Sequence, residues 1–206
     1  NSIGLFVDLT NCENYIKMRS LNLNFNPFPE IHTKRLQLRS ITADDAEWLL
    51  EMRSDPTMME FIDRPLMREK SEALELITKI ATTIQKGEGM LWAITEIGSE
   101  RMIGSVSYHN IDSTNLMGEL GYMLHTDFQK KGIMQEAVMS VITFGFTKIG
   151  FHRIEANINT GNESSRKLLL RNGFKKEALF RENYYYNDKF LDSEIYGLLE
   201  HEWSKY

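Results

Sequence analysis

Cysteine is almost absent from this chain of 206 residues, which contains one, Cys12. A single cysteine cannot form an intramolecular disulfide, a CxxC redox pair or a cysteine-based zinc site. Its scarcity therefore argues against a small secreted scaffold held by disulfides and predicts a cytoplasmic protein. At this length one domain can bury enough surface to be stable without a covalent staple.

Long apolar runs and a basic excess are also missing. The longest uncharged apolar segment, residues 137–146, is interrupted by Ser140, Thr143 and Gly145, whereas a membrane-spanning helix needs about 20 apolar residues. Lysine and arginine number 24 against 29 acidic residues, a net charge of −5. Non-specific nucleic-acid binding depends on clustered basic residues. We therefore expect neither a membrane nor a nucleic acid as partner.

Motifs of several large enzyme classes are absent as well. The chain has no GxGxxG after a strand and no GxxxxGK[ST], GxSxG or HExxH, and its five histidines are scattered. These absences argue against dinucleotide enzymes, P-loop NTPases, α/β-hydrolases and zinc proteases. We expect no metal cofactor.

The fold class follows from the order of the predicted elements. Alternating apolar residues predict strands at 36–39, 90–95, 102–109, 116–124, 153–158, 174–185 and 190–199. Helical spacing and caps predict helices at 44–53, 68–86, 133–149 and 163–171. In the helix at 68–86 we expect a core-facing stripe of Leu74, Ile77, Ala81 and Ile84. This order predicts a single-domain α/β (α+β) fold built on one mixed sheet.

A polar loop between the strand at 116–124 and the helix at 133–149 is the most informative segment. The free N–H groups and partial positive charge at the start of a helix favour phosphate binding. The loop adds two basic side chains and a glycine that lets the backbone approach a ligand, within the run Gln129, Lys130, Lys131, Gly132, Ile133 and Met134. Spacing alone leaves open the alternative of a solvated loop with a glycine at a helix start.

Taken together, these segments resemble the GNAT acetyltransferases, in particular the RimJ/RimL-type ribosomal-protein N-terminal acetyltransferases. The resemblance rests on the loop with Glu136-Ala137 and on four further segments, 28–39, 118–122, 162–168 and 172–174, with Arg181 and Asp192 near the end. It implies a GNAT domain at residues 27–206, whose mainly antiparallel central sheet is flanked by helices. Residues 1–26 form a separate N-terminal arm.

The arm has its own pattern, with Leu5, Phe6, Leu9 and Ile16 at helix-like spacing. We expect a short helical arm that contributes to a homodimer contact. A packed appendage with no role in the chemistry is the alternative.

The resemblance implies acetyl-CoA as co-substrate. Its pyrophosphate would rest on the backbone amides of residues 129–134, where Met134 stands in place of the usual small residue. Its pantetheine arm would lie beside Met123 and Leu124 and pair with their free backbone groups. Asn162 and Ser165, three residues apart on one helical face, would point toward the thioester.

Acetyl transfer needs a base for the amine, a donor for the oxyanion and a proton for the leaving thiolate. Glu119 is the base candidate, because strand alternation puts it on one face with Gly121 and Met123; a solvent-facing carboxylate is the alternative. A backbone N–H near Leu124 would hold the oxyanion.

The tyrosine that protonates the thiolate in many GNATs is replaced here by Leu169. Ser165 takes that role by resemblance to the RimL branch, with water, or a serine of purely structural role, as alternatives. Tyr108 is a candidate for lining the acceptor pocket.

The predicted function is transfer of an acetyl group from acetyl-CoA to a primary amine, directly in a ternary complex. The acceptor is a protein N-terminus or, alternatively, a small-molecule amine such as a polyamine. A non-catalytic acyl-CoA-binding sensor is a further alternative. Because Lys130 and Lys131 lie at the cofactor loop, we expect the acidic surplus on the acceptor side.

Overall fold

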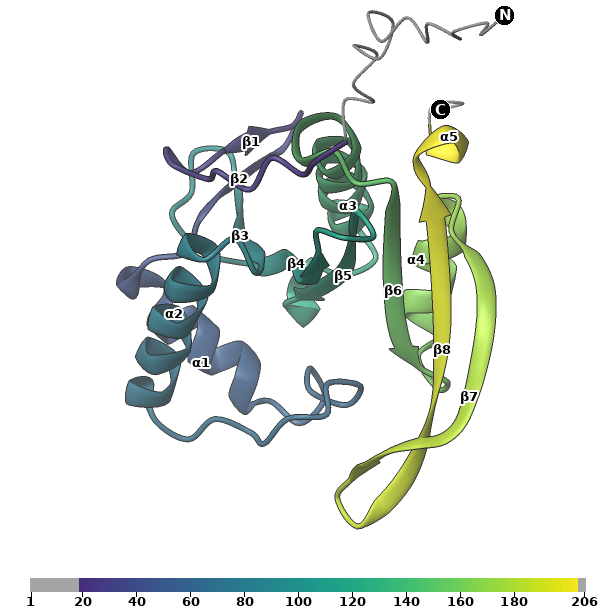
Figure 1. Ribbon diagram of the computed structural model, residues 1–206. Helices are drawn as coiled ribbons and strands as arrows, with labels where there is room; N and C mark the ends of the chain where they lie inside the picture. Colours follow the sequence, from purple (N-terminus) through teal and green to yellow (C-terminus); the bar gives the residue numbers. More distant parts are fainter. Residues whose placement is uncertain (1–18, 204–206) are drawn as a thin grey trace, which may run out of the picture.

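A computed structural model describes residues 19–203 and contains one mixed sheet flanked by helices (Figure 1). The strand order is β1-β2-β3-β4-β5-β6-β8-β7, and every neighbouring pair is antiparallel except β5 and β6. This confirms the predicted fold class. The strands are β1 Ile31–His32, β2 Leu36–Ser40, β3 Met90–Glu96, β4 Gly104–Asp112, β5 Met117–Leu124, β6 Arg153–Asn159, β7 Lys175–Tyr186 and β8 Lys189–Leu199.

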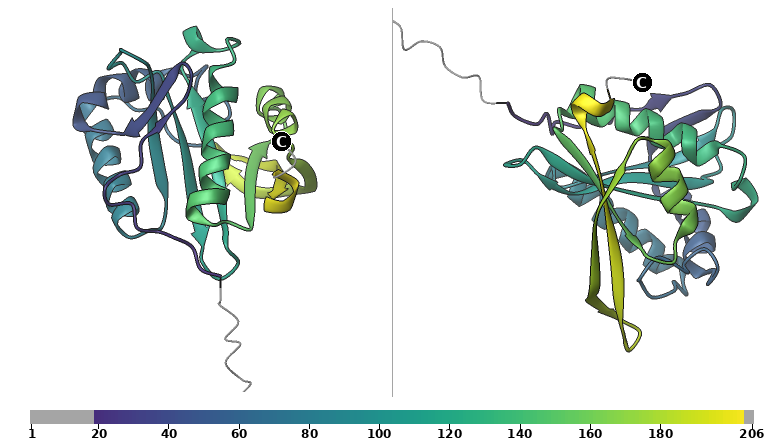
Figure 2. Two further views of the ribbon diagram at one scale, coloured as in Figure 1. Left: turned by 90° about the horizontal axis from the view of Figure 1, so that it is seen from above. Right: turned by 90° about the vertical axis from the view of Figure 1, so that its right-hand side faces the viewer.

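The helices cover the two faces of this sheet (Figure 2). Side chains of α1 and α2 pack in one apolar cluster with Ala93, Met102 and Met123, whereas those of α3 and α4 belong to a larger cluster on the opposite face. The helices are α1 Ala46–Ser54, α2 Lys70–Gln85, α3 Ile133–Phe144, α4 Glu163–Arg171 and a short α5 Glu200–Trp203. Among residues 19–203, no helix has the length and apolar character needed to cross a membrane.

Two predicted elements need correction in detail. The predicted helix at 133–149 is α-helical to Phe144 and then continues as a π-helix to Ile149, before Gly150 ends it at a φ of 89°. In α2 the buried residues are Ala73 and Ile77, while Leu74 and Ala81 of the predicted stripe are exposed. The core-facing stripe of α2 is therefore rotated by about one residue from the predicted one, which places Leu76 and Ile80 against the cluster that α1 shares.

A two-residue hairpin connects the last two strands of the chain. Asn187 and Asp188 both have positive φ, 47° and 58°, as a type I′ turn requires, and they connect β7 to β8. The hairpin projects well beyond the rest of the sheet (Figure 2).

The predicted N-terminal arm is described only from residue 19, and its predicted helical positions lie outside the described residues. Residues 19–26 pack on the domain: Arg19 forms an ion pair with Glu200 at 2.6 Å, and the Asn22 N–H donates to Ile149. The Phe25 side chain is part of the main core. In the described part of the chain, residue 27 is therefore not a structural boundary.

Candidate active site

The most distinctive feature of the sheet is a gap between β5 and β6, where two parallel strands pair over only a short stretch. Their register runs from Met117 opposite Arg153 to Glu119 opposite Glu155 and stops there. Beyond Glu119 the strands diverge, so that β6, β8 and β7 lean away from the first five strands (Figure 1). Residues 120–124 of β5 thus have no strand partner on the side of β6, and we call this break in the pairing the gap.

The strand edge that faces this gap carries free backbone groups. The His125 N–H donates to the Ile103 carbonyl at 2.8 Å, and residues of an antiparallel strand alternate between its two sides. Met123 therefore directs its backbone groups toward β4, whereas Leu124 and Tyr122 direct theirs into the gap. Of the two residues predicted to pair with the pantetheine arm, Leu124 has the suitable backbone orientation, and the Met123 side chain is buried beneath α1 and α2.

The start of α3 lies at the mouth of the gap and offers a row of unpaired amides. In the described part of the chain, no hydrogen-bond acceptor faces the backbone N–H groups of residues 130–134. Lys130 and Gly132 have positive φ of 59° and 74°, which turns the chain into the helix. The Gln129 side chain donates to the Leu124 carbonyl at 3.1 Å and ties the loop to the end of β5.

A salt bridge from the other end of the sheet holds this loop in place. The Arg35 guanidinium contacts Glu136 of α3 at 2.6 Å and donates to the Lys131 carbonyl at 2.9 Å. Because these contacts position the backbone, the amides can point at an anion without rearrangement, as phosphate sites at helix N-termini require. The loop residues predicted from sequence, including Ile133 and Met134 in the first turn, are thus arranged as an anion site requires, and their binding of an anion stays a prediction.

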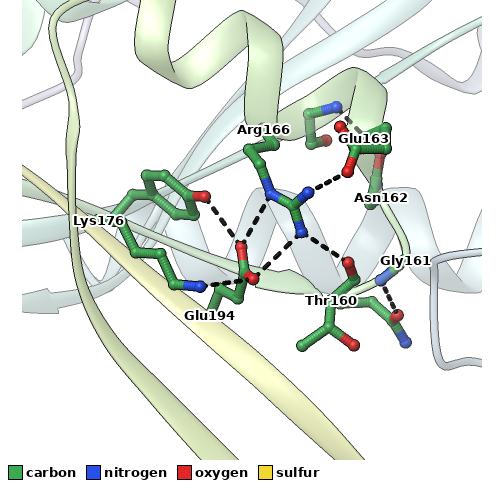
Figure 3. Close-up of polar contacts among 10 residues, drawn as sticks. Thr160, Gly161, Asn162, Glu163, Arg166, Lys176 and Glu194 are labelled. Carbon is green, nitrogen blue, oxygen red and sulfur yellow. Dashed lines mark hydrogen bonds and ion pairs between the residues drawn. The ribbon is translucent and has the colours of Figure 1, made fainter.

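The start of α4 lies across the gap from β5. The Asn162 side-chain oxygen accepts a hydrogen bond from the Ser165 N–H at 3.0 Å and caps the helix. A buried ion-pair network fixes this end of α4 on β8: Arg166 contacts Glu194 at 3.1 Å, and Lys176 contacts it at 2.7 Å (Figure 3). This network determines where the Ser165 side chain lies.

Sequence reasoning missed Tyr122, which lies beside Ser165. Its hydroxyl is buried and has no hydrogen-bond partner in the described part of the chain. Burial raises the pKa of Tyr122 to about 12, although the neighbouring Ser165 hydroxyl lowers it. The two hydroxyls are thus close together but outside hydrogen-bonding geometry. Alternation along β5, which directs Tyr122 to the face opposite Glu119, was the available signal.

Glu119 lies at the point where the pairing of β5 and β6 ends. Its carboxylate contacts His109 Nε2 at 3.2 Å and accepts from the Asn110 side chain at 2.8 Å. Burial raises its pKa, but the hydrogen bonds from His109 and Asn110 outweigh this effect and leave the pKa below the ordinary glutamate value. The group is a carboxylate near neutral pH and can accept a proton.

Tyr108 does not lie beside Glu119. It pairs in register with Leu120, one residue out of phase with Glu119, so its ring enters the opposite face of the sheet. The side chain is 1% exposed, and its hydroxyl donates to the Val141 carbonyl of α3 at 2.9 Å. The ring thus belongs to the core, but Tyr108 is also among the residues that line the pocket beneath α2, and its role at an acceptor pocket stays a prediction.

The pocket beside His109 has no acidic lining. A pocket of about 220 Å³ lies beneath α2 near His109, and its wall contains Arg53 and Lys79 but no carboxylate. The expectation of an acidic acceptor side does not hold there. Elsewhere on this side, the loop between α1 and α2 contacts the β7 hairpin through Asp63 and Tyr184, whose oxygens are 2.8 Å apart.

Comparison with known proteins agrees with this geometry. Acetyltransferase (GNAT) domains match residues 35–175 of the chain. The chain belongs to the GNAT acetyltransferase family. It is thus an acyltransferase enzyme with N-acetyltransferase relatives, and GNAT enzymes use acetyl-CoA.

Three relatives illustrate the similarity. YoaA of Bacillus subtilis, an uncharacterized N-acetyltransferase, is 30% identical over 84% of this chain and 98% of its own. The ribosomal-protein-serine acetyltransferase of Escherichia coli is 27% identical over 55% of this chain and 62% of its own. RimL, a ribosomal L7/L12 alpha-N-protein acetyltransferase solved with coenzyme A, shares the fold, with a TM-score of 0.76 at 20% identity over 83% of this chain and 98% of its own.

Proposed function

We propose that this GNAT enzyme transfers the acetyl group of acetyl-CoA to the N-terminal amine of a protein, by direct transfer in a ternary complex. The observation that carries the proposal is the gap between β5 and β6. On one face of the sheet it meets the free amides of residues 130–134, and on the other it meets Glu119. The two substrates can thus reach the gap from opposite faces.

The residues on the cofactor face suit coenzyme A. The amides of residues 130–134 would bind its pyrophosphate, and Lys130 and Lys131 would add positive charge. The Leu124 backbone groups would pair with the amides of the pantetheine arm as an added strand does. Coenzyme A supplies the thioester, and the protein contributes its binding and orientation.

The transfer step needs few groups. Glu119 takes a proton from the acceptor ammonium, directly or through water, and the neutral nitrogen attacks the thioester carbonyl. A backbone N–H near Leu124 stabilises the oxyanion. The C–N bond forms and the C–S bond breaks, and the thiolate takes a proton from the Ser165 hydroxyl, beside which Tyr122 lies. The nitrogen loses its second proton as the amide forms, and this proton restores the Ser165 hydroxyl through water. Water is the alternative proton donor.

The acceptor class is supported by the names of the relatives, which include ribosomal-protein acetyltransferases. A small-molecule amine is the second candidate, favoured by the small volume of the pocket beside His109. Incubation of the protein with acetyl-CoA and matched sets of N-terminal peptides and small amines, with detection of free thiol, separates the two. Tight acetyl-CoA binding without thiol release above that of the Glu119→Gln variant on either set would contradict the proposal.

A further inference from the structure

The pocket beside the candidate base has a chemical character that the acetyl transfer itself does not explain. It lies between α2 and the strands β3 and β4. Much of its lining is apolar and comes from Leu76, Ile80, Ile84, Met90 and Leu91. Its basic side chains are Arg53, Lys79 and His109; Tyr108 also lines it, and no aspartate or glutamate does. A protonated amine alone would find no counter-ion in this pocket.

Arg53 is the unusual member of this wall. Its Nε atom is buried without a hydrogen-bond partner, and in the described residues its guanidinium has neither an ion pair nor a hydrogen bond. Burial, and then the nearby charge of Arg64, lower its pKa. Buried guanidinium groups are normally paired, because an unpaired charge is costly to remove from water.

Other arginines of this protein follow that rule. Arg39 contacts Asp45 at 2.7 Å, Arg153 contacts Glu155 at 2.8 Å, and Arg166 contacts Glu194. Each of these guanidinium groups has a carboxylate within the fold. Arg53 has none, so the fold leaves one partly buried guanidinium to be satisfied by something that enters the pocket.

The pocket and the reaction site share a residue. His109 lines the pocket and also contacts the Glu119 carboxylate at 3.2 Å. A molecule that places its amine at Glu119 can therefore place another part of itself in the pocket. A guanidinium forms a planar, bidentate pair with a carboxylate and is therefore well suited to bind that group.

We infer that the acceptor carries a carboxylate that binds Arg53 while its amine lies at Glu119. This inference rests on the proposed function and specifies its substrate class. Two sources could supply such an acceptor: a protein N-terminus with an aspartate or glutamate close behind the terminal amine, or a small amine with its own carboxylate. Both combine the amine, a short apolar part and the anion that the pocket wall requires.

Paired acceptors test the inference. For each of the first few positions after the terminal amine, one pair of N-terminal peptides differs only by aspartate against asparagine. A pair of small amines differs only by carboxylate against carboxamide. We expect kcat/KM to be higher for the acidic member of at least one pair by roughly tenfold or more, the effect of one charge-assisted bidentate contact. The pair that shows the preference identifies the source.

Variants assign the preference to the pocket. Arg53→Met should reduce the ratio of acidic to neutral kcat/KM to about one, mainly through KM for the acidic acceptor. Arg68→Met removes an exposed arginine from the loop before α2 that is not part of the pocket wall, and should leave the ratio as it is. Thermal unfolding of each variant reports whether the fold is intact, and Arg53→Lys, which keeps the charge, should retain part of the preference.

Binding measurements separate failure of the inference from failure of the proposed function. The affinity of each acidic and neutral acceptor is measured by calorimetry in the presence of coenzyme A. Equal affinities, or a preference that survives Arg53→Met, would overturn the inference even if acetylation occurs. An Arg53-dependent preference for the acidic acceptor without any acetylation would support the inference and contradict the proposed function.

Discussion

The two sides of the gap offer a ligand different kinds of group, mainly backbone groups on one side and side chains on the other. On the cofactor side the groups offered to a ligand belong to the backbone: the amides of residues 130–134 and the edge of β5 at Leu124. On the acceptor side they belong to side chains, namely Arg53, Lys79, His109 and Glu119. A site made of backbone groups can persist while its side chains change, whereas a site made of side chains changes with each substitution. We therefore expect the first to be common to the family and the second to determine the substrate.

Loss of the candidate base should have the largest effect, and this effect should be on kcat and not on the affinity for acetyl-CoA. Glu119→Gln keeps the size of the side chain and removes its ability to accept a proton, so kcat should fall by about 10²- to 10⁴-fold. The affinity for acetyl-CoA should change little, because the cofactor side does not use this carboxylate. Steady-state kinetics and calorimetry measure the two quantities. Glu96→Gln, at an exposed strand position, is the matched control, and equal losses in both variants would contradict the assignment.

Removal of the buried anchor of α4 should have the next largest effect. Glu194 is 4% exposed and holds Arg166 and Lys176. Glu194→Ala removes the shared partner of two partly exposed cations and should lower the free energy of unfolding by about 1.5–3 kcal/mol, the range for hydrogen bonds to charged groups. Glu163→Ala removes only the exposed partner of Arg166 and should cost no more than about 1 kcal/mol. Urea denaturation of both variants checks the difference, and similar losses would show that the network does not hold α4.

Replacement of the candidate proton donor, Ser165, should affect the rate of acetyl transfer but not the binding of acetyl-CoA. Ser165→Ala should lower kcat by roughly 10- to 100-fold, toward the lower end of general acid catalysis, and should leave the acetyl-CoA dissociation constant nearly unchanged. The Asn162 cap uses the Ser165 backbone N–H, which alanine keeps. Single-turnover kinetics measures the step. An unchanged rate would transfer the role to water, and a weakened acetyl-CoA affinity would make Ser165 a binding residue.

The cofactor loop should respond to backbone conformation rather than to side-chain chemistry. Gly132 has a φ of 74°, and holding valine in this left-handed conformation costs about 1–2 kcal/mol of conformational free energy. The free loop of the variant should leave this conformation, and because acetyl-CoA must then restore it, its affinity should fall roughly tenfold. Gly98→Val is the matched control, because Gly98 has a φ of 83° in an open turn with no atom near its Cβ position. Both variants should lose similar stability, but only Gly132→Val should lose affinity. Equal affinities by calorimetry would contradict the role of the loop.

Sequence reasoning succeeded where local pattern determines structure. The loop at 129–134 and the cap at Asn162 are short-range features, and strand alternation alone separates the two faces of β5. It failed where long-range packing decides. The face that α2 buries, for example, depends on its contact with α1. No local pattern reveals that Arg53 lacks a partner, since pairing is a property of the folded chain.

The direct test of this account is amide hydrogen exchange with and without acetyl-CoA. We predict that acetyl-CoA slows hydrogen exchange at the amides of residues 130–134 and of Leu124. The exchange of strands β3 and β4 around the pocket should not change until an acceptor is added. Slower exchange confined to the pocket strands, with no change at the start of α3, would contradict the assignment of the two sides.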